Sequence, residues 1–177
     1  MRTIGKFTGL TLILIIWAGF TMAGNFAVDN SKSTVTWIGR KFTGEHTGTI
    51  KIQSGSLDVR HKAITGGNIT IDMNSITDED LKDAGMNSKL IGHLKSDDFF
   101  AVARFPVSKL ELTGVKKLAG NNVEFSGNLT IKGITNPVTF KANTVIEGKI
   151  LTAVGDMVIN RAKFDVRYGS GSFFGGL

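Results

Sequence analysis

Alternation of apolar and polar side chains is the feature that most constrains how this chain can fold. In the clearest run, from Val123 to Lys132, one face carries Val123, Phe125, Leu129 and Ile131, and the other face is polar. Successive side chains of a β-strand point to opposite faces, so this run predicts a half-buried antiparallel strand. Because such runs dominate the chain, we expect an all-β protein.

Further runs of this kind recur about every ten residues, with turn-forming residues between them. The predicted strands are residues 34–42, 46–52, 56–61, 68–73, 138–146, 150–159 and 162–168. The predicted turns are residues 53–55, 65–67, 120–122, 135–137 and 147–149. No internal repeat, long linker or low-complexity tract divides the chain. The pattern favours one antiparallel sandwich or barrel.

One segment interrupts the alternation with a helical pattern. Thr77 is followed by three acidic residues, as at a capped helix N-terminus, and Leu90, Ile91 and Leu94 share a helical face. Gly85 is expected to break this segment into two short helices. We therefore predict an antiparallel β-barrel with a short helical insertion around residues 77–96, covering one end of the barrel.

The N-terminus has the order of features found in an export signal. Arg2 and Lys6 precede an apolar run from residue 10 to residue 20, which is short for a membrane span. Small residues follow around Ala23, as at a signal-peptidase site. An anchoring helix is the alternative. We predict a signal peptide at residues 1–23, a single domain at residues 24–177, and a periplasmic or secreted protein.

Composition and motifs argue against several classes of function. The chain has no cysteine, which excludes thiol catalysis, cysteine-based metal sites and lipid attachment through an N-terminal cysteine. Its net charge of +6 is scattered, so we expect no nucleic-acid partner and at most peripheral membrane contact. His46, His61 and His93 lack the paired spacing of a zinc site, so no metal is expected. Hydrolase, phosphate-loop and zinc-protease motifs are missing, so we expect neither catalysis nor a cofactor.

Four blocks in order carry a resemblance to a known family. They are residues 37–48, residues 66–76 followed by 93–100, residues 127–138, and residues 160–171. Over residues 26–174 the chain resembles the YceI family of bacterial periplasmic lipid-binding proteins. The resemblance implies a lipocalin-like barrel whose elongated cavity holds a polyisoprenoid or another long-chain fatty lipid. Members usually continue with one more strand, whereas this chain ends at Leu177, so a truncated closing strand is one expectation.

The inward faces of the predicted strands supply the expected lipid-binding residues. They are Val35, Trp37, Ile50, Ile52, Ile69, Ile71, Phe125, Leu129, Ile131 and Phe140, with Phe99 and Phe100 guarding the helical end. Gly48 and Gly127 would leave room for a ligand. The alternative is that all of these residues form an ordinary packed core.

His46 and Arg161 are the polar candidates to orient a lipid head group at the cavity mouth. We expect Arg161 to meet either His46 or a buried acid such as Asp72. The alternative is a satisfied buried hydrogen bond.

Two functions remain open from the sequence. The first is binding, sequestration or transport of a long apolar lipid without catalysis. The second is a periplasmic stress-response or interaction protein with a ligand-free barrel. Apolar residues on both faces of the 150–159 strand indicate either burial on both sides or a protein–protein contact, such as a homodimer.

Overall fold

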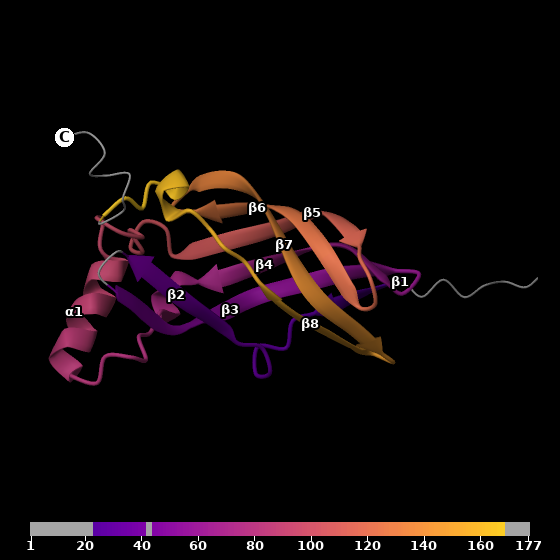
Figure 1. Ribbon diagram of the computed structural model, residues 1–177, viewed down its shortest axis with the longest axis horizontal. Coiled ribbons are helices and arrows are strands. Elements are labelled where there is room, and N and C mark those ends of the chain that lie inside the picture. Colours follow the sequence, from indigo (N-terminus) through magenta and orange to yellow (C-terminus); the bar gives the residue numbers. More distant parts are fainter. Residues whose placement is uncertain (1–22, 42–43, 169–177) are drawn as a thin grey trace, which may run out of the picture.

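A computed structural model of the chain describes residues 23–41 and 44–168 (Figure 1). The strands are β1 (Ala23–Ala27), β2 (Val35–Lys41), β3 (Gly44–Arg60), β4 (Ala63–Asp72), β5 (Val107–Lys117), β6 (Asn122–Ile131), β7 (Ile134–Glu147) and β8 (Ile150–Asp156). The helices are η1 (Met73–Ser75), α1 (Ala84–Lys95) and η2 (Arg161–Phe164). Residues 1–22 of the predicted signal segment (residues 1–23) and the tail beyond residue 168 lie outside the described residues.

All strand pairs are antiparallel and form one curled sheet. The order is β1-β3-β4-β5-β6-β7-β8, with β2 also paired to β3. The long β3 strand carries β2 along residues 44–50 and β1 along residues 56–60. Within the described residues, no ladder joins β8 to β1 or β2, so the sheet is a half-barrel. This confirms the predicted all-β antiparallel fold with a helical insertion.

Three predicted turns are wrong. Residues 53–55 lie inside β3, which continues through a bulge between Ile52 and Ser54. Residues 65–67 lie inside β4, and residues 135–137 lie inside β7. The actual turns lie at His61-Lys62 and at Lys132-Gly133, where the backbone has positive φ. Glycine at position 67 serves close packing instead, since a Cβ there would collide with the carbonyl of Ser56.

Two strands were missed, and one predicted strand is a helix. β1 and β5 were not predicted; the bulge between Leu112 and Gly114 shifts the alternation within β5. Residues 162–168, predicted as a strand, begin with the short helix η2. The side chain of Asn160 caps η2 by accepting a hydrogen bond from the backbone N–H of Ala162.

The helical insertion is one helix rather than two. Asp83 caps α1 by accepting a hydrogen bond from the backbone N–H of Met86 at 2.8 Å, and Gly85 lies in the first turn. Thr77, which we expected to be the cap, pairs with β3 instead. Figure 1 shows α1 at one end of the curled sheet, so the predicted cover at one end of the barrel is confirmed. No helix within residues 23–41 and 44–168 has the length and apolarity of a membrane span.

In the described part of the chain, three clusters of buried apolar side chains hold the sheet in its curled form. One includes Leu57, Leu112 and Phe125, away from α1. A second joins Ile50 to Leu94 of α1. The third joins β6 to the buried Phe164 and to Val166 of the 161–168 segment. The concave face between these clusters is the surface on which a ligand could lie.

Candidate functional site

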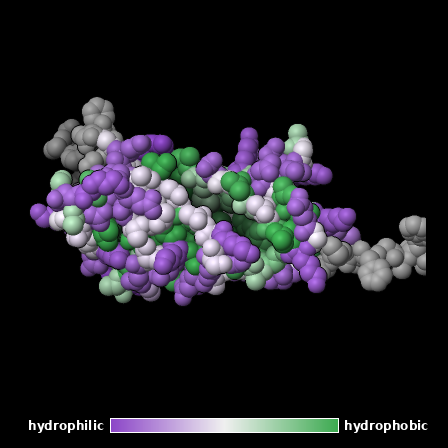
Figure 2. Space-filling view, turned by 90° about the horizontal axis from the view of Figure 1, so that it is seen from below, coloured by the Kyte–Doolittle hydropathy of each residue, from purple (hydrophilic) through white to green (hydrophobic). Residues whose placement is uncertain are grey.

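The register of the strands places apolar side chains of neighbouring strands side by side on the concave face. Ile69 of β4 lies opposite Leu110 of β5, which lies opposite Leu129 of β6. Phe125 of β6 lies opposite Phe140 of β7, with ring centroids 5.3 Å apart. Paired residues of an antiparallel ladder share a face, so these side chains form a continuous apolar surface. Figure 2 shows apolar side chains gathered along a hollowed strip of the molecule.

The twelve residues predicted to contact lipid divide into two groups by exposure. The buried residues are Ile50, Phe125, Leu129 and Ile131. The half-buried residues are Val35, Trp37, Ile52, Ile69, Ile71, Phe99, Phe100 and Phe140. A core residue of a packed barrel would be covered on all sides, whereas this second group retains exposed apolar area. The concave face is therefore an apolar lining that is only partly covered by the protein itself.

Phe99 and Phe100 occupy the helical end, as predicted. Their rings lie 4.9 Å apart in an edge-to-face arrangement. Both pack against the cluster under α1 and against the cluster that contains Phe164. They therefore join the two clusters at the covered end of the barrel.

Several residues of this lining were not among the predicted lipid contacts. Those packed against the clusters include Phe26, Leu110, Val115, Val123, Val138, Ile146, Leu151 and Met157. Leu110 and Leu112 keep the alternation of a strand, and the bulge after Leu112 puts Val115 back on the same face. Allowing one bulge in the pattern would have found β5 and its lining residues.

Among the hollows on the described surface, two are more polar. One, of about 670 Å³, is bounded by residues from β1, β3 and β4 that include Asp58 and Arg60. The other, of about 400 Å³, is bounded mainly by polar residues of β4, β5 and β6, among them Lys109 and Glu111. Charged walls of this kind do not suit an apolar chain, so neither hollow fits a long-chain lipid.

The two glycines expected to leave room for a ligand do something else. A Cβ at Gly48 would collide with the carbonyl oxygen of Thr77, so this glycine lets residues 77–80 lie against β3. A Cβ at Gly127 would press on the carbonyl oxygen of Glu111 in the neighbouring strand. At both glycines another segment of backbone lies in close contact, so neither glycine leaves free volume for a ligand.

The expected contact of Arg161 with His46 or Asp72 is wrong. The Nη1 of Arg161 donates a hydrogen bond to the carbonyl of Val166 at 2.9 Å, and its guanidinium lies 5.2 Å from the ring centre of Phe99. Partial burial lowers the pKa of Arg161. Arg161 therefore lies at the phenylalanine-lined end of the barrel, whereas Asp72 caps the short helix η1.

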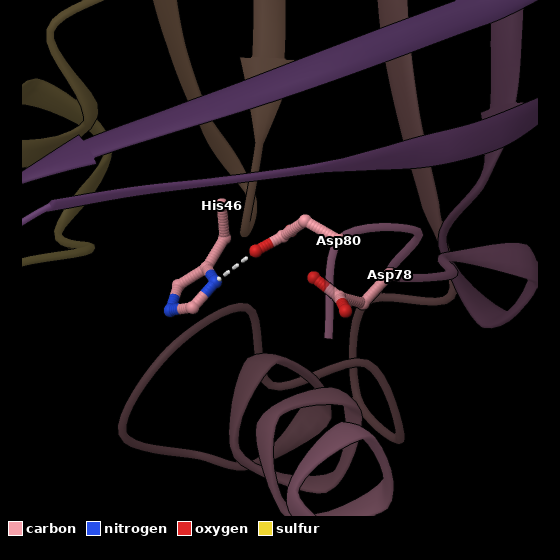
Figure 3. A group of neighbouring side chains, drawn as sticks. All are labelled: His46, Asp78 and Asp80. Atoms are coloured by element: carbon pink, nitrogen blue, oxygen red, sulfur yellow. Dashed lines mark hydrogen bonds and ion pairs between the residues drawn. The ribbon is translucent and has the colours of Figure 1, made fainter. Parts of the chain in front are cut away.

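The fold instead brings His46 to a pair of acids. Residues 77–79 lie along β3, with backbone hydrogen bonds of 2.9 Å from Thr77 to Thr49 and from Glu79 to Thr47. This pairing places Asp80 over His46, where its Oδ2 lies 2.9 Å from the imidazole Nδ1 (Figure 3).

The two acids differ in environment. The Oδ1 of Asp80 accepts a hydrogen bond from the Thr47 backbone N–H at 2.8 Å. That bond, with His46 as the second cause, lowers the pKa of Asp80 from 3.8 to about 2. Asp78 is buried, and burial raises its pKa. Sequence reasoning missed this group because it treated Asp78 and Asp80 as helix-capping acids.

Comparison with known proteins identifies the family. The YceI-like domain matches residues 26–176 of the chain. The chain belongs to the YceI-like family. A UPF0312 protein of Enterobacter sp. strain 638 is 37% identical over 103 residues, which are 57% of this chain and 50% of the relative. Protein YceI of Salmonella arizonae is 35% identical over 103 residues, with the same two shares. The chain thus spans half the length of these curated relatives.

Solved structures share the YceI-like fold. BcnA of Burkholderia cenocepacia superposes with a TM-score of 0.67 at 24% identity, covering 78% of this chain and 84% of BcnA. A polyisoprenoid binding domain from Saccharophagus degradans, implicated in plant cell wall breakdown, gives a TM-score of 0.55 at 15% identity. That match covers 86% of this chain and 83% of the domain. At these identities the likeness establishes the fold alone.

Proposed function

We propose that the concave face of this YceI-like chain binds a long-chain apolar lipid of the polyisoprenoid type, and sequesters or transports it without turnover. The half-buried apolar lining carries this proposal, because eight of the twelve predicted contact residues retain exposed area there. Membership of a family of binding domains supports a binding role. The Saccharophagus degradans neighbour, described as polyisoprenoid-binding, supports this class of ligand.

The energetics favour recognition of chain length over recognition of a head group. Each buried methylene contributes about 0.8 kcal/mol, so one five-carbon isoprene unit contributes roughly 3–4 kcal/mol at most. Longer chains cannot keep adding at that rate, because affinities saturate and large ligands bind less efficiently per atom. Affinity should therefore rise with chain length until the lining is filled and then level off.

A chain-length series tests this proposal. Polyprenols and fatty amides of increasing length would compete with a fluorescent fatty-chain probe for the purified protein. The proposal expects affinity to rise and then reach a plateau, with little dependence on the head group. Equal affinity for very short and very long chains would contradict it, as would a dominant effect of the head group.

For location we propose export to the periplasm. The basic N-terminus with Arg2 and Lys6, the apolar run after it and the small residues near Ala23 support export. Cell fractionation with N-terminal sequencing of the recovered protein tests it. Cleavage close to Ala23 in the periplasmic fraction is expected, and an uncleaved chain in the membrane fraction would support an anchoring helix instead.

A second candidate, self-association through β8, rests on a separate observation. The outward side chains Ile150 and Val154 are each 69% exposed on a strand that pairs only with β7 in the described part of the chain. An exposed apolar edge strand can pair with another chain, and a second copy presents the same edge. Val154→Asp should convert a dimer to a monomer in sedimentation velocity. A parent chain that is monomeric at high concentration would rule this candidate out.

A further inference from the structure

Three ligand-forming side chains converge where residues 77–80 lie against β3. His46 offers an imidazole nitrogen, and Asp78 and Asp80 each offer a carboxylate oxygen; these three atoms all lie within 4.8 Å of one another. Figure 3 shows the imidazole and the two carboxylate groups close together. They come from segments more than thirty residues apart, and the pairing of residues 77–79 with β3 brings them into one place.

Asp78 provides an independent indication of a ligand. Its residue exposure is 8%, and its Oδ1 is satisfied by the backbone N–H of Leu81 and by the side-chain amide of Asn87. Its Oδ2 is buried and has no hydrogen-bond partner within the described structure. A buried carboxylate oxygen without a partner is costly, so such an atom calls for a cation or a proton.

The donor set indicates which kind of cation fits. Imidazole nitrogen and carboxylate oxygen are both ligands that Zn²⁺ and neighbouring transition metals accept, whereas Mg²⁺ and Ca²⁺ prefer oxygen alone. Zinc bonds of about 2.0–2.2 Å in a tetrahedron place ligand atoms roughly 3.3 Å apart. The 2.9 Å between His46 Nδ1 and Asp80 Oδ2 lies just inside that spacing, and all three ligand atoms lie within 4.8 Å of one another, so the side chains would adjust around a bound ion.

We propose that His46, Asp78 and Asp80 form a binding site for a divalent transition-metal cation of the Zn²⁺ class. Three protein ligands leave one coordination position to water or to an added ligand. The site holds residues 77–80 on β3 at the covered end of the barrel. The indole of Trp37 donates a hydrogen bond to the carbonyl of Thr77 at 2.9 Å, so the metal also fixes the loop that orients one lining residue.

Zinc titration of the chain, purified without an affinity tag, tests this site directly. Calorimetry with Zn²⁺ should show one ion bound per chain, and the unfolding midpoint should rise with added Zn²⁺ by mass action. Co²⁺ in place of Zn²⁺ should give visible ligand-field bands. Asp78→Asn should weaken Zn²⁺ binding at least tenfold while keeping the oxygen that accepts from Leu81.

Matched variants separate a metal site from general effects on charge. His46→Asn should also weaken Zn²⁺ binding at least tenfold and abolish the Co²⁺ bands. His61→Asn is its control, since His61 is exposed at a turn with positive φ that asparagine tolerates. Asp97→Asn is the control for Asp78→Asn, because Asp97 is a surface acid paired with Arg104. Both controls should bind Zn²⁺ as the parent chain does.

Two results would overturn the proposal. One is the lack of saturable Zn²⁺ binding at one equivalent in the parent chain. The other is His46→Asn binding Zn²⁺ as tightly as His61→Asn does; His46 is partly exposed, so its replacement should not prevent folding. In either case the group would be a carboxyl pair that shares a proton beside a histidine. Lipid binding is measured separately, so failure here leaves the proposed function untouched.

Discussion

Ile52→Gln is the substitution that most directly separates a lipid-binding lining from a packed core. Ile52 lies on the concave face opposite Ile71 and is half-buried, yet it belongs to none of the three buried clusters. Its exposed part is apolar area that a bound lipid would cover. Replacing it should therefore weaken lipid binding, and it should lower the free energy of unfolding less than replacing a buried cluster residue does.

The magnitude follows from the exposed part of this side chain. Complete burial of an isoleucine side chain contributes about 1.5–3 kcal/mol, and a bound lipid would bury only the part that the protein leaves exposed. Desolvation of the glutamine amide adds to that loss. A total of about 1–2 kcal/mol corresponds to a dissociation constant roughly 5- to 30-fold larger.

Lys51→Gln is the matched control, because the neighbouring residue of the same strand points to the opposite face. Displacement of a fluorescent fatty-chain probe gives the affinities of both variants, and urea unfolding gives their stabilities. We expect less than a twofold change in affinity for Lys51→Gln. Equal affinities in the two variants, with both folded, would refute the reasoning.

Three further predictions concern stability and are measured by denaturant unfolding. Folding lowers the pKa of Asp80 from 3.8 to about 2, so Asp80 stabilises the fold above pH 3.8, and this contribution disappears as the pH falls through 2. Asp80→Asn should reduce that pH dependence of the free energy of unfolding, and an unchanged pH profile would contradict the prediction. Gly48→Ala should destabilise the fold by about 1–3 kcal/mol, because the added Cβ collides with the backbone of Thr77. Gly92→Ala, within α1 and in open space, should stabilise it by about 0.5–1 kcal/mol. Equal effects of the two substitutions would refute the close approach of Thr77 to Gly48. Phe164→Ala should cost about 3–5 kcal/mol, since Phe164 is only 2% exposed, and a loss below 1 kcal/mol would show that it does not anchor the covered end.

The alternation of side chains was enough to predict the all-β fold and most of its strands. Period two survives wherever one face of a strand is buried, as it is in β6 and β7. It fails at bulges, because one extra residue reverses the phase. For that reason β3 was divided at residues 53–55 and β5 was missed.

Glycine and asparagine predicted the turns less well than the alternation of side chains predicted the strands. Gly67 and residues 135–137 lie inside strands, while the turn at His61-Lys62 carries residues that are not typical turn formers. Glycine was needed at position 67 because Ser56 of the neighbouring strand lies against it. That requirement comes from tertiary packing, which local sequence does not reveal.

The inward faces of the recognised strands were predictable from the sequence, and the group of His46, Asp78 and Asp80 was not. Trp37 and Phe140 could be placed because alternation fixes which side of a strand faces inward. His46 and Asp80 meet only through the pairing of residues 77–79 with β3, a contact between segments far apart in sequence. A run of acids after Thr77 is more commonly the start of a helix. For that reason these acids were not considered as partners of His46, and Arg161 was considered instead.

Mass spectrometry of an organic extract of the natively purified protein tests the central claim most directly, with an extract of an unrelated periplasmic barrel as the control. The account predicts one long-chain apolar species, near one molecule per chain or per dimer, that is missing from the control. An extract without such a species, together with no rise in the unfolding midpoint on adding isoprenoid or fatty amide, would contradict the account. The concave face would then be no more than an incompletely covered core.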